Sequence, residues 1–238
     1  MGLVDSRRLD PDRSYGWRRV AVQIPRAALC ALALAIVALP RPAAAAPDAP
    51  VKIVALGDSL TAGYGLLEQD GFVPRLQAAL AAKGVAAEVA NAGVSGDTTA
   101  DGLARLDWSV PPDTDAVILE LGANDMLRGI RPEVARDNLD AILRRLTGRH
   151  IGVLLCGMRA APNLGADYAA AFDGIYPALA AKYGVPLYPF FLDGAAANLS
   201  LLQHDGLHPS AAGVGVIVDR ILPQVQELVA QVRGRRPS

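Results

Sequence analysis

From about residue 50 to the C-terminus, short apolar runs alternate with longer segments in which apolar residues recur at helical spacing. The apolar runs predict strands over residues 51–56, 86–90, 116–121, 151–156 and 185–188. The periodic segments predict helices over residues 72–83, 98–108, 132–146, 167–183 and 211–232. Such alternation is typical of a parallel sheet that is covered by helices on both faces. The pattern therefore predicts an α/β fold, a three-layer α/β/α sandwich around a mostly parallel five-stranded sheet.

Residues with candidate chemistry follow the first three predicted strands. Ser59 comes after the first strand in the sequence GDSL, Gly93 follows the second in NAG, and Asn124 follows the third in LGAND. In an open parallel sheet, ligands bind outside the carboxyl ends of the strands. We therefore expect Ser59, Gly93 and Asn124 to lie together at the carboxyl ends of the strands.

A histidine and an aspartate near the C-terminus complete a candidate catalytic set. Asp205 and His208 lie in the segment 189–209, the longest stretch without a clear period. A serine hydroxyl needs a neighbouring base to become a nucleophile, and an imidazole ordinarily titrates near neutral pH. Because Gly206 and Pro209 disfavour a helix, a turn would present both side chains together. We predict that Ser59 is the nucleophile, that His208 is the base and that Asp205 orients the imidazole.

Each of these residues also has an ordinary structural explanation. Ser59 alone is compatible with a helix cap, Gly93 with a turn, and Asn124 with a strand-to-helix turn. Asp58 is expected to support the turn before Ser59, since no second carboxylate is obviously paired with it. The joint occurrence at strand ends, together with the late Asp–His pair, favours catalysis.

A metal site is a weaker interpretation of the same residues. His204 and His208 are four residues apart, as in some zinc sites. Gly206 interrupts a continuous helix between them, and no third ligand has a diagnostic spacing. We expect no metal and no other cofactor, and we assign no role to His150.

The four segments, in this order, resemble the SGNH (GDSL) hydrolase superfamily. Residues 56–65 and 120–129 are similar to its bacterial arylesterase / acyl-CoA thioesterase I / lysophospholipase L1 branch, and the resemblance covers most of residues 51–215. It implies a flavodoxin-like strand order and an acyl-enzyme on Ser59. It also implies hydrolysis of aryl esters, acyl thioesters or lysophospholipids, so the expected partner is a small-molecule or lipid ester.

The resemblance further assigns an oxyanion hole. Its donors would be the backbone N–H groups of Ser59 and Gly93 and the side-chain amide of Asn124. A glycine at position 93 would let the backbone approach a ligand closely, and a helix starting at Ser59 would add a favourable dipole. Met126 and Leu127 are candidate contacts for an acyl chain, although packing in the core explains them equally well.

Two competing functions remain open at this point. The first is an O-acetyl esterase acting on carbohydrate or cell-wall glycans, which the low aromatic content of 5% disfavours because sugars stack on aromatic rings. The second is a noncatalytic binding domain on the same scaffold, which the presence of both serine and histidine disfavours. A nucleotide site is not indicated, since the first strand-turn has no G-x-G-x-x-G or Walker pattern.

The first 46 residues have the order of a secretory signal peptide. Residues 1–26 carry six arginines, residues 27–39 form an apolar run, and alanines fill positions 43–46. The apolar run is shorter than the roughly 20 residues that cross a bilayer, so we expect no stable membrane anchor. We predict removal of residues 1–46 and export to the periplasm or medium, by the general or the twin-arginine route. Residues 47–232 would form the hydrolase domain, and residues 233–238 a disordered basic tail.

Charge and cysteine content narrow the remaining classes. The leader holds seven arginines and three aspartates of the 23 basic and 24 acidic residues, which leaves 16 and 21 in the mature chain. A mildly acidic protein without a basic stripe is not expected to bind nucleic acid. Only Cys156 remains after processing, so we expect a buried thiol and no intramolecular disulfide. The oligomeric state is left open.

Overall fold

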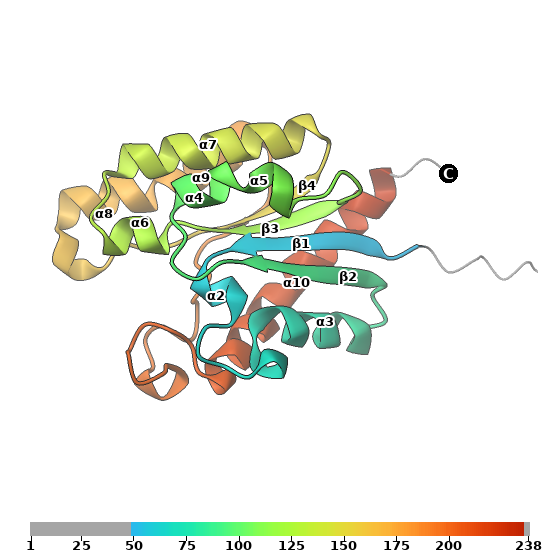
Figure 1. Cartoon of the computed structure of the whole chain (residues 1–238), viewed down its shortest axis with the longest axis horizontal. Helices are drawn as coiled ribbons and strands as arrows, with labels where there is room; N and C mark the ends of the chain where they lie inside the picture. The colour runs from blue at the N-terminus through green and yellow to red at the C-terminus, as the bar shows by residue number, and fades with distance from the viewer. Residues whose placement is uncertain (1–48, 236–238) are drawn as a thin grey trace, which may run out of the picture. The chain divides into compact units, whose positions relative to one another are not determined.

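The computed structural model describes residues 49–235, so the predicted signal peptide lies outside the described residues. Five parallel strands form one sheet in the order β2-β1-β3-β4-β5 (Figure 1). The strands are β1 (Val51–Gly57), β2 (Ala87–Gly93), β3 (Ala116–Glu120), β4 (Gly152–Cys156) and β5 (Leu187–Tyr188). This is the flavodoxin-like order, which reverses direction at β1 and β3. The predicted α/β class, the five strands and the strand order are confirmed.

Helices cover both faces of the sheet. The α-helices are α2 (Ser59–Ala62), α3 (Phe72–Ala82), α4 (Thr99–Ala104), α5 (Leu106–Ser109), α6 (Ala123–Leu127), α7 (Pro132–Gly148), α8 (Ala166–Asp173), α9 (Ile175–Tyr183) and α10 (Ala211–Arg235). Short 3-10 turns are η1 (Glu68–Asp70), η2 (Pro162–Leu164) and η3 (Leu199–Leu201). Helices α3 and α10 pack together on one face, and α4, α7 and α9 lie on the other (Figure 1). The three layers are therefore confirmed.

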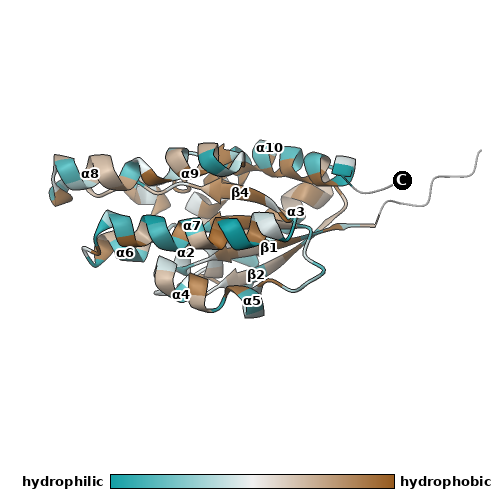
Figure 2. Cartoon of the chain, turned by 90° about the horizontal axis from the view of Figure 1, so that it is seen from above, coloured by the Kyte–Doolittle hydropathy of each residue, from teal (hydrophilic) through white to brown (hydrophobic). Residues whose placement is uncertain are grey.

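The central strands explain why the sequence pattern predicted the sheet correctly. Every residue of β3 and β4 is buried, and Figure 2 shows β4 as mostly apolar against helices of mixed character. Strands covered on both faces appear in the sequence as nearly continuous apolar runs. Glu120, the last residue of β3, is the exception, because it is an ionisable residue with no exposed surface.

Several boundaries differ from the sequence prediction. The helix predicted over 98–108 is two helices separated at Arg105, whose guanidinium donates to the Gly57 carbonyl oxygen at 2.9 Å. The helix predicted over 167–183 is divided at Gly174 into α8 and α9. Helix α10 continues to Arg235, so residues 233–235 are helical rather than part of a disordered tail. These differences depend on tertiary contacts and helix ends that local periodicity does not report.

Strand β2 forms one edge of the sheet, because it pairs only with β1. The side chain of Gln77, on α3, lies along this edge. Its Nε2 donates to the Ala87 carbonyl oxygen at 2.9 Å, and its Oε1 accepts from the Val89 N–H at 2.8 Å. The amide thus makes the two hydrogen bonds that a neighbouring strand would make there.

Candidate active site

Ser59, His208 and Asp205 lie in one hydrogen-bonded row at the carboxyl ends of the strands. His208 Nε2 is 2.8 Å from Ser59 Oγ, and His208 Nδ1 is 2.6 Å from Asp205 Oδ2. Both distances are within hydrogen-bond reach, which a nucleophile and its base require. The row unites residues that are 149 positions apart in the sequence.

The turn predicted around Asp205 holds this row in place. Asp205 Oδ1 accepts from the N–H groups of Leu207 at 2.9 Å and His208 at 3.0 Å, and Gly206 has a φ of 70°. These backbone donors, followed by the His208 side chain, lower the pKa of Asp205 to about 2. The carboxylate that faces the imidazole is therefore ionised at neutral pH.

Asp58 gives Ser59 its local conformation. Asp58 is the N-cap of α2, and its Oδ1 accepts from the Leu60 N–H at 3.0 Å. Ser59 is thus the first residue of α2 rather than its cap. Because α2 has only four residues, the helix dipole expected at Ser59 is small.

Two of the three expected oxyanion donors already have acceptors. Asn124 Nδ2 donates to Asp58 Oδ2 at 3.1 Å and to the Asp97 carbonyl oxygen at 3.0 Å, so both of its N–H bonds are used. The Gly93 N–H donates to Asn91 Oδ1 at 2.9 Å. Within residues 49–235, the Ser59 N–H has no hydrogen-bond partner. Ser59 therefore offers the one unoccupied donor among these three.

The loop after β2 contains a further donor that the sequence analysis did not single out. A Cβ on Gly93 would lie 2.3 Å from the Ala62 backbone nitrogen, so this glycine is needed for packing of β2 against α2. Gly96 has a φ of 90°, and no partner for its N–H lies in the described part of the chain. It directly precedes Asp97, whose carbonyl oxygen binds Asn124. A positive φ at Gly96 is not visible in the sequence.

Glu120 is the other site residue that sequence reasoning missed. Its Oε2 accepts from Thr61 Oγ1 at 2.8 Å and from the Asp58 N–H at 3.3 Å, so Asp58 does have a second carboxylate beside it. Burial, followed by the charge of Asp58, raises the pKa of Glu120 well above its ordinary value. Burial also raises the pKa of Asp58 to about 6. The two residues are 62 positions apart, and they meet because Gly57 and Glu120 are register partners in β1 and β3.

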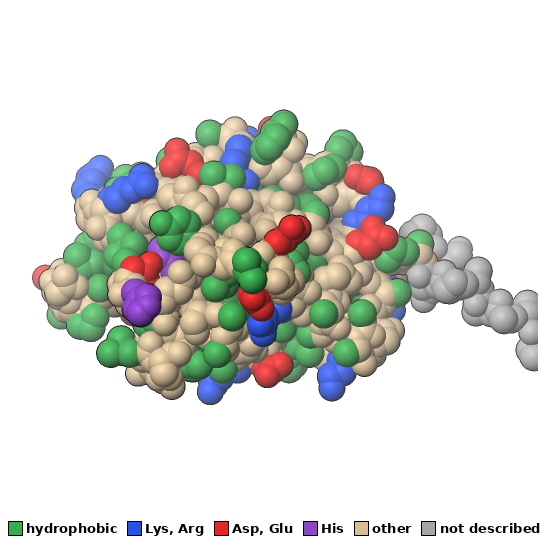
Figure 3. All heavy atoms as spheres, turned by 60° about the horizontal axis from the view of Figure 1, so that its bottom comes forward, with side chains coloured by type: hydrophobic (Ala, Val, Ile, Leu, Met, Phe, Trp, Pro, Cys, Tyr) green, Lys and Arg blue, Asp and Glu red, His purple; other side chains and the backbone are tan. Residues whose placement is uncertain are grey.

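The two candidate acyl-chain contacts have different environments. Met126 is packed in the hydrophobic core and is 8% exposed, whereas Leu127 is 53% exposed. Tyr64 is also exposed, and its ring centroid lies 4.7 Å from that of His208. Hydrophobic side chains lie beside the histidines on the face shown in Figure 3. Leu127 thus remains a candidate contact, while Met126 has a structural role.

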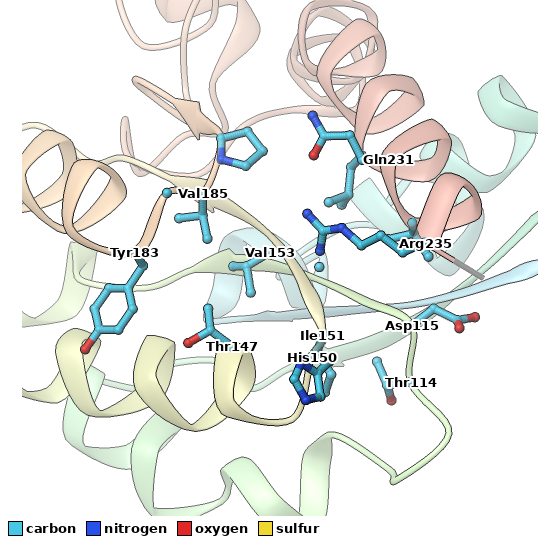
Figure 4. Close-up of a pocket in the computed structure, with 15 residues that line it drawn as sticks. Thr114, Asp115, Thr147, His150, Ile151, Val153, Tyr183, Val185, Gln231 and Arg235 are labelled. Atoms are coloured by element: carbon cyan, nitrogen blue, oxygen red, sulfur yellow. The ribbon is translucent and has the colours of Figure 1, made fainter. Parts of the chain in front are cut away.

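One cavity lies away from these residues. It measures about 650 Å³ and is lined by residues that precede β3, β4 and β5, including Thr114, His150 and Val185 (Figure 4). It therefore lies at the amino ends of these strands, whereas Ser59 lies at the carboxyl end of β1. A second cavity, of about 290 Å³, is lined by residues of α2, α3 and β2, among them Ala62, Gln77 and Asn91. Among residues 49–235, no three His, Cys, Asp or Glu side chains gather as a metal site.

Comparisons with known proteins show the family to which the chain is similar. Residues 55–216 match the model of the GDSL-like Lipase/Acylhydrolase family. Esterase TesA of Pseudomonas aeruginosa is 38% identical over 205 residues, which are 86% of this chain and 100% of that protein. Thioesterase 1/protease 1/lysophospholipase L1 of Escherichia coli is 37% identical over 187 residues, 78% of this chain and 87% of that protein. The crystal structure of AlinE4, an SGNH-hydrolase family esterase, is 49% identical with a TM-score of 0.64, covering 75% of this chain and 96% of that one.

Proposed function

This chain belongs to the GDSL-like lipase/acylhydrolase family and is a serine hydrolase of ester bonds, and from that premise we propose that it works through an acyl-enzyme on Ser59. The observation that carries the proposal is the row from Ser59 Oγ through His208 to Asp205 Oδ2, with distances of 2.8 and 2.6 Å. No other serine of the described residues is hydrogen-bonded to a histidine.

The proposed reaction has two halves. Ser59 Oγ attacks the carbonyl carbon of the ester and passes its proton to His208 Nε2, while Asp205 stabilises the imidazolium. The tetrahedral intermediate collapses, the C–O bond to the alcohol breaks, and His208 returns the proton to the departing alcohol. Water then attacks the acyl-Ser59 carbonyl with His208 as base, which releases the carboxylic acid and restores Ser59.

The negative charge of the intermediate needs hydrogen-bond donors. We assign the Ser59 N–H and the Asn124 amide to this role: one amide N–H stays on Asp58 Oδ2, and the other leaves the Asp97 carbonyl oxygen for the substrate. The expected third donor, the Gly93 N–H, would first have to leave Asn91 Oδ1. The Gly96 N–H has no such competitor, which favours it as the third donor.

The substrate class is proposed as acyl esters, with acyl thioesters or lysophospholipids included. Relatives carry the names esterase, arylesterase and thioesterase/lysophospholipase. The exposed Leu127, three residues after Asn124, and the cavity lined by Ala62, Leu67 and Val89 are the candidate apolar surfaces for an acyl chain. An O-acetyl glycan esterase is the competing reading, and chain-length preference separates the two.

The test is kcat/KM on p-nitrophenyl esters from acetate to laurate, with Ser59→Ala measured alongside. We expect an optimum at medium or long chains, and a fall in kcat of about 10⁶-fold in Ser59→Ala with an unchanged fold. Activity confined to acetate would favour glycan deacetylation. Undiminished kcat in folded Ser59→Ala would overturn the mechanism and reopen the noncatalytic alternative for this site.

Export is also proposed, from the order of residues 1–46. In the described part of the chain, no helix is long and apolar enough to cross a membrane. Mass spectrometry of the protein recovered from the periplasm or medium is expected to show a chain that begins near residue 47. Recovery of only the full-length chain from the cytoplasm would contradict the proposal.

A further inference from the structure

A buried pair of carboxyl groups lies next to Asn124, one of the proposed oxyanion donors. Asp58 and Glu120 both have no exposed surface, and the Asp58 N–H donates to Glu120 Oε2 at 3.3 Å. A Cβ on Gly57 would lie 2.6 Å from Glu120 Oε2, so the absence of a side chain there makes room for the pair. Glu120 takes no part in the proposed acyl-enzyme steps.

The two carboxyl groups have different hydrogen-bond environments. Both oxygens of Asp58 accept N–H bonds, Oδ1 from Leu60 at 3.0 Å and Oδ2 from Asn124 at 3.1 Å. Glu120 Oε2 accepts from Thr61 Oγ1, but Glu120 Oε1 is buried without a partner among the described residues. An unpaired buried carboxylate oxygen is costly, whereas a protonated one becomes a donor.

The charges around the pair also indicate that one of the two carboxyl groups is protonated. Within residues 49–235, no lysine or arginine forms an ion pair with either carboxyl group, and two like charges this close and this dry cannot both ionise. Asp58 has the donors that stabilise an anion, so the proton belongs on Glu120. Burial and the Asp58 charge keep the pKa of Glu120 high.

We propose that Glu120 is a positioning residue: as a buried neutral acid it donates to the Asp58 carboxylate, and Asp58 in turn fixes the Asn124 amide beside Ser59. The chain of contacts runs from Thr61 and Glu120 through Asp58 to Asn124. It links the loop after β1 with the loop after β3, which carry two of the proposed oxyanion donors. This inference rests on the proposed role of Asn124.

Other ionisable groups face the pair from each neighbouring element. They are His208 from the loop before α10, Cys156 from β4, Tyr176 from α9, and Arg105, which binds the Gly57 carbonyl oxygen. None of them is hydrogen-bonded to Asp58 or Glu120 in the described residues. A change at Glu120 therefore reaches Asn124 through Asp58.

The experiment compares Glu120→Leu and Glu120→Gln with the wild type and with Glu133→Leu, a control at an exposed glutamate of α7. In Glu120→Leu we expect kcat for an ester to fall about 10- to 100-fold with little change in KM, because one oxyanion donor loses its orientation. Glu120→Gln is expected to recover most of that loss, since its amide donates to Asp58 while its oxygen accepts from Thr61. The control should match the wild type.

The pH profile gives a readout that a purely structural role would not move. In Glu120→Leu the Asp58 carboxylate loses a donor, so the acidic limb of kcat/KM is expected to shift to higher pH than in the wild type. Infrared difference spectra of wild type against Glu120→Gln at neutral pH should show the C=O stretch of one protonated carboxylic acid. This measurement stands even if Glu120→Leu does not fold.

Three results would overturn the inference. They are full kcat in folded Glu120→Leu, a Glu120→Gln variant as impaired as Glu120→Leu, and absence of the protonated-acid band. A failure of the proposed function looks different, because then wild-type ester turnover would not depend on Ser59 at all.

Discussion

Asp205 combines two tasks that belong to a single side chain. One oxygen accepts the backbone N–H groups of Leu207 and His208, and the other faces the imidazole. The turn and the catalytic row therefore depend on the same carboxylate. Since the pKa of Asp205 is about 2, its charge does not change over the range in which imidazole titrates.

Asp205→Asn separates the tasks, because an amide oxygen still accepts the backbone bonds while the charge is lost. We expect kcat to fall by up to about 10⁴-fold, less than in Ser59→Ala, since nucleophile, base and oxyanion donors remain. Steady-state kinetics of the two variants on one ester measures the difference. Equal losses would mean that Asp205 does more than orient His208.

Gly57 is the residue on which the packing of the site depends most closely. A Cβ there would lie 2.1 Å from Thr61 Oγ1 and 2.7 Å from the Glu120 carbonyl oxygen. We expect Gly57→Ala to destabilise the fold by about 1–3 kcal/mol, as overpacking of a core does, and to lower kcat as well. Urea unfolding measures the first effect. Gly84→Ala is a control without a clash, because nothing lies within 4 Å of the added Cβ. Since Gly84 has a φ of 68°, any loss of stability in this variant comes from backbone strain alone.

At the scale of elements, the loop that carries His208 is tied to the loop after α2. Gln203 Nε2 donates to the carbonyl oxygens of Tyr64 at 2.8 Å and Pro209 at 3.0 Å, and the Gln203 N–H donates to the His208 carbonyl oxygen at 2.7 Å. Gly65 makes the approach feasible, since a Cβ there would lie 2.3 Å from Gln203 Oε1. The position of the base thus depends on a side chain five residues away from it.

Gln203→Ala removes this connection without touching the catalytic row. We expect a fall in kcat of about 10-fold, with a smaller change in KM, because misplacing the base affects the reacting geometry more than substrate binding. Gln69→Ala, at an exposed glutamine of η1, is the matched control. Kinetics indistinguishable from that control would show that the loop holds His208 by other contacts.

The elements that the sequence predicted well are those whose signal is local. The buried strands β1, β3 and β4 are continuous apolar runs, and the pairing of Asp205 with His208 needs only a turn of four residues. The contacts that it did not predict depend on distant partners. The Asp58–Glu120 pair requires the register of β1 against β3, and the occupied N–H of Gly93 depends on the rotamer of Asn91.

At the scale of the whole molecule, the buried carboxyl groups make stability depend on pH. Raised pKa values mean that the folded state holds protons that the unfolded chain releases, so this stabilisation is present at low pH. It is lost as pH rises through about 6 for Asp58, and above the ordinary range of a glutamate for Glu120. Asp205 acts in the opposite sense, because its contribution is lost only as pH falls toward about 2.

Glu120→Gln removes one of these protons from the balance. As pH rises above the ordinary range of a glutamate carboxyl, we expect the unfolding free energy of the wild type to decline relative to that of Glu120→Gln, by up to about 1.4 kcal/mol per pH unit. Urea unfolding of both proteins at several pH values measures the slope. Parallel pH curves would mean that Glu120 titrates alike in the folded and unfolded states.

The hydrogen bonds of the Gln77 amide to strand β2 affect how copies of this protein associate in concentrated solution. An unoccupied strand edge is a template on which another chain can add a strand, which is a common start of aggregation. Because Gln77 occupies the Ala87 carbonyl oxygen and the Val89 N–H, strand addition is disfavoured at these two positions of β2. A side chain that the proposed hydrolysis does not use thus occupies two backbone groups on which another chain could otherwise add a strand.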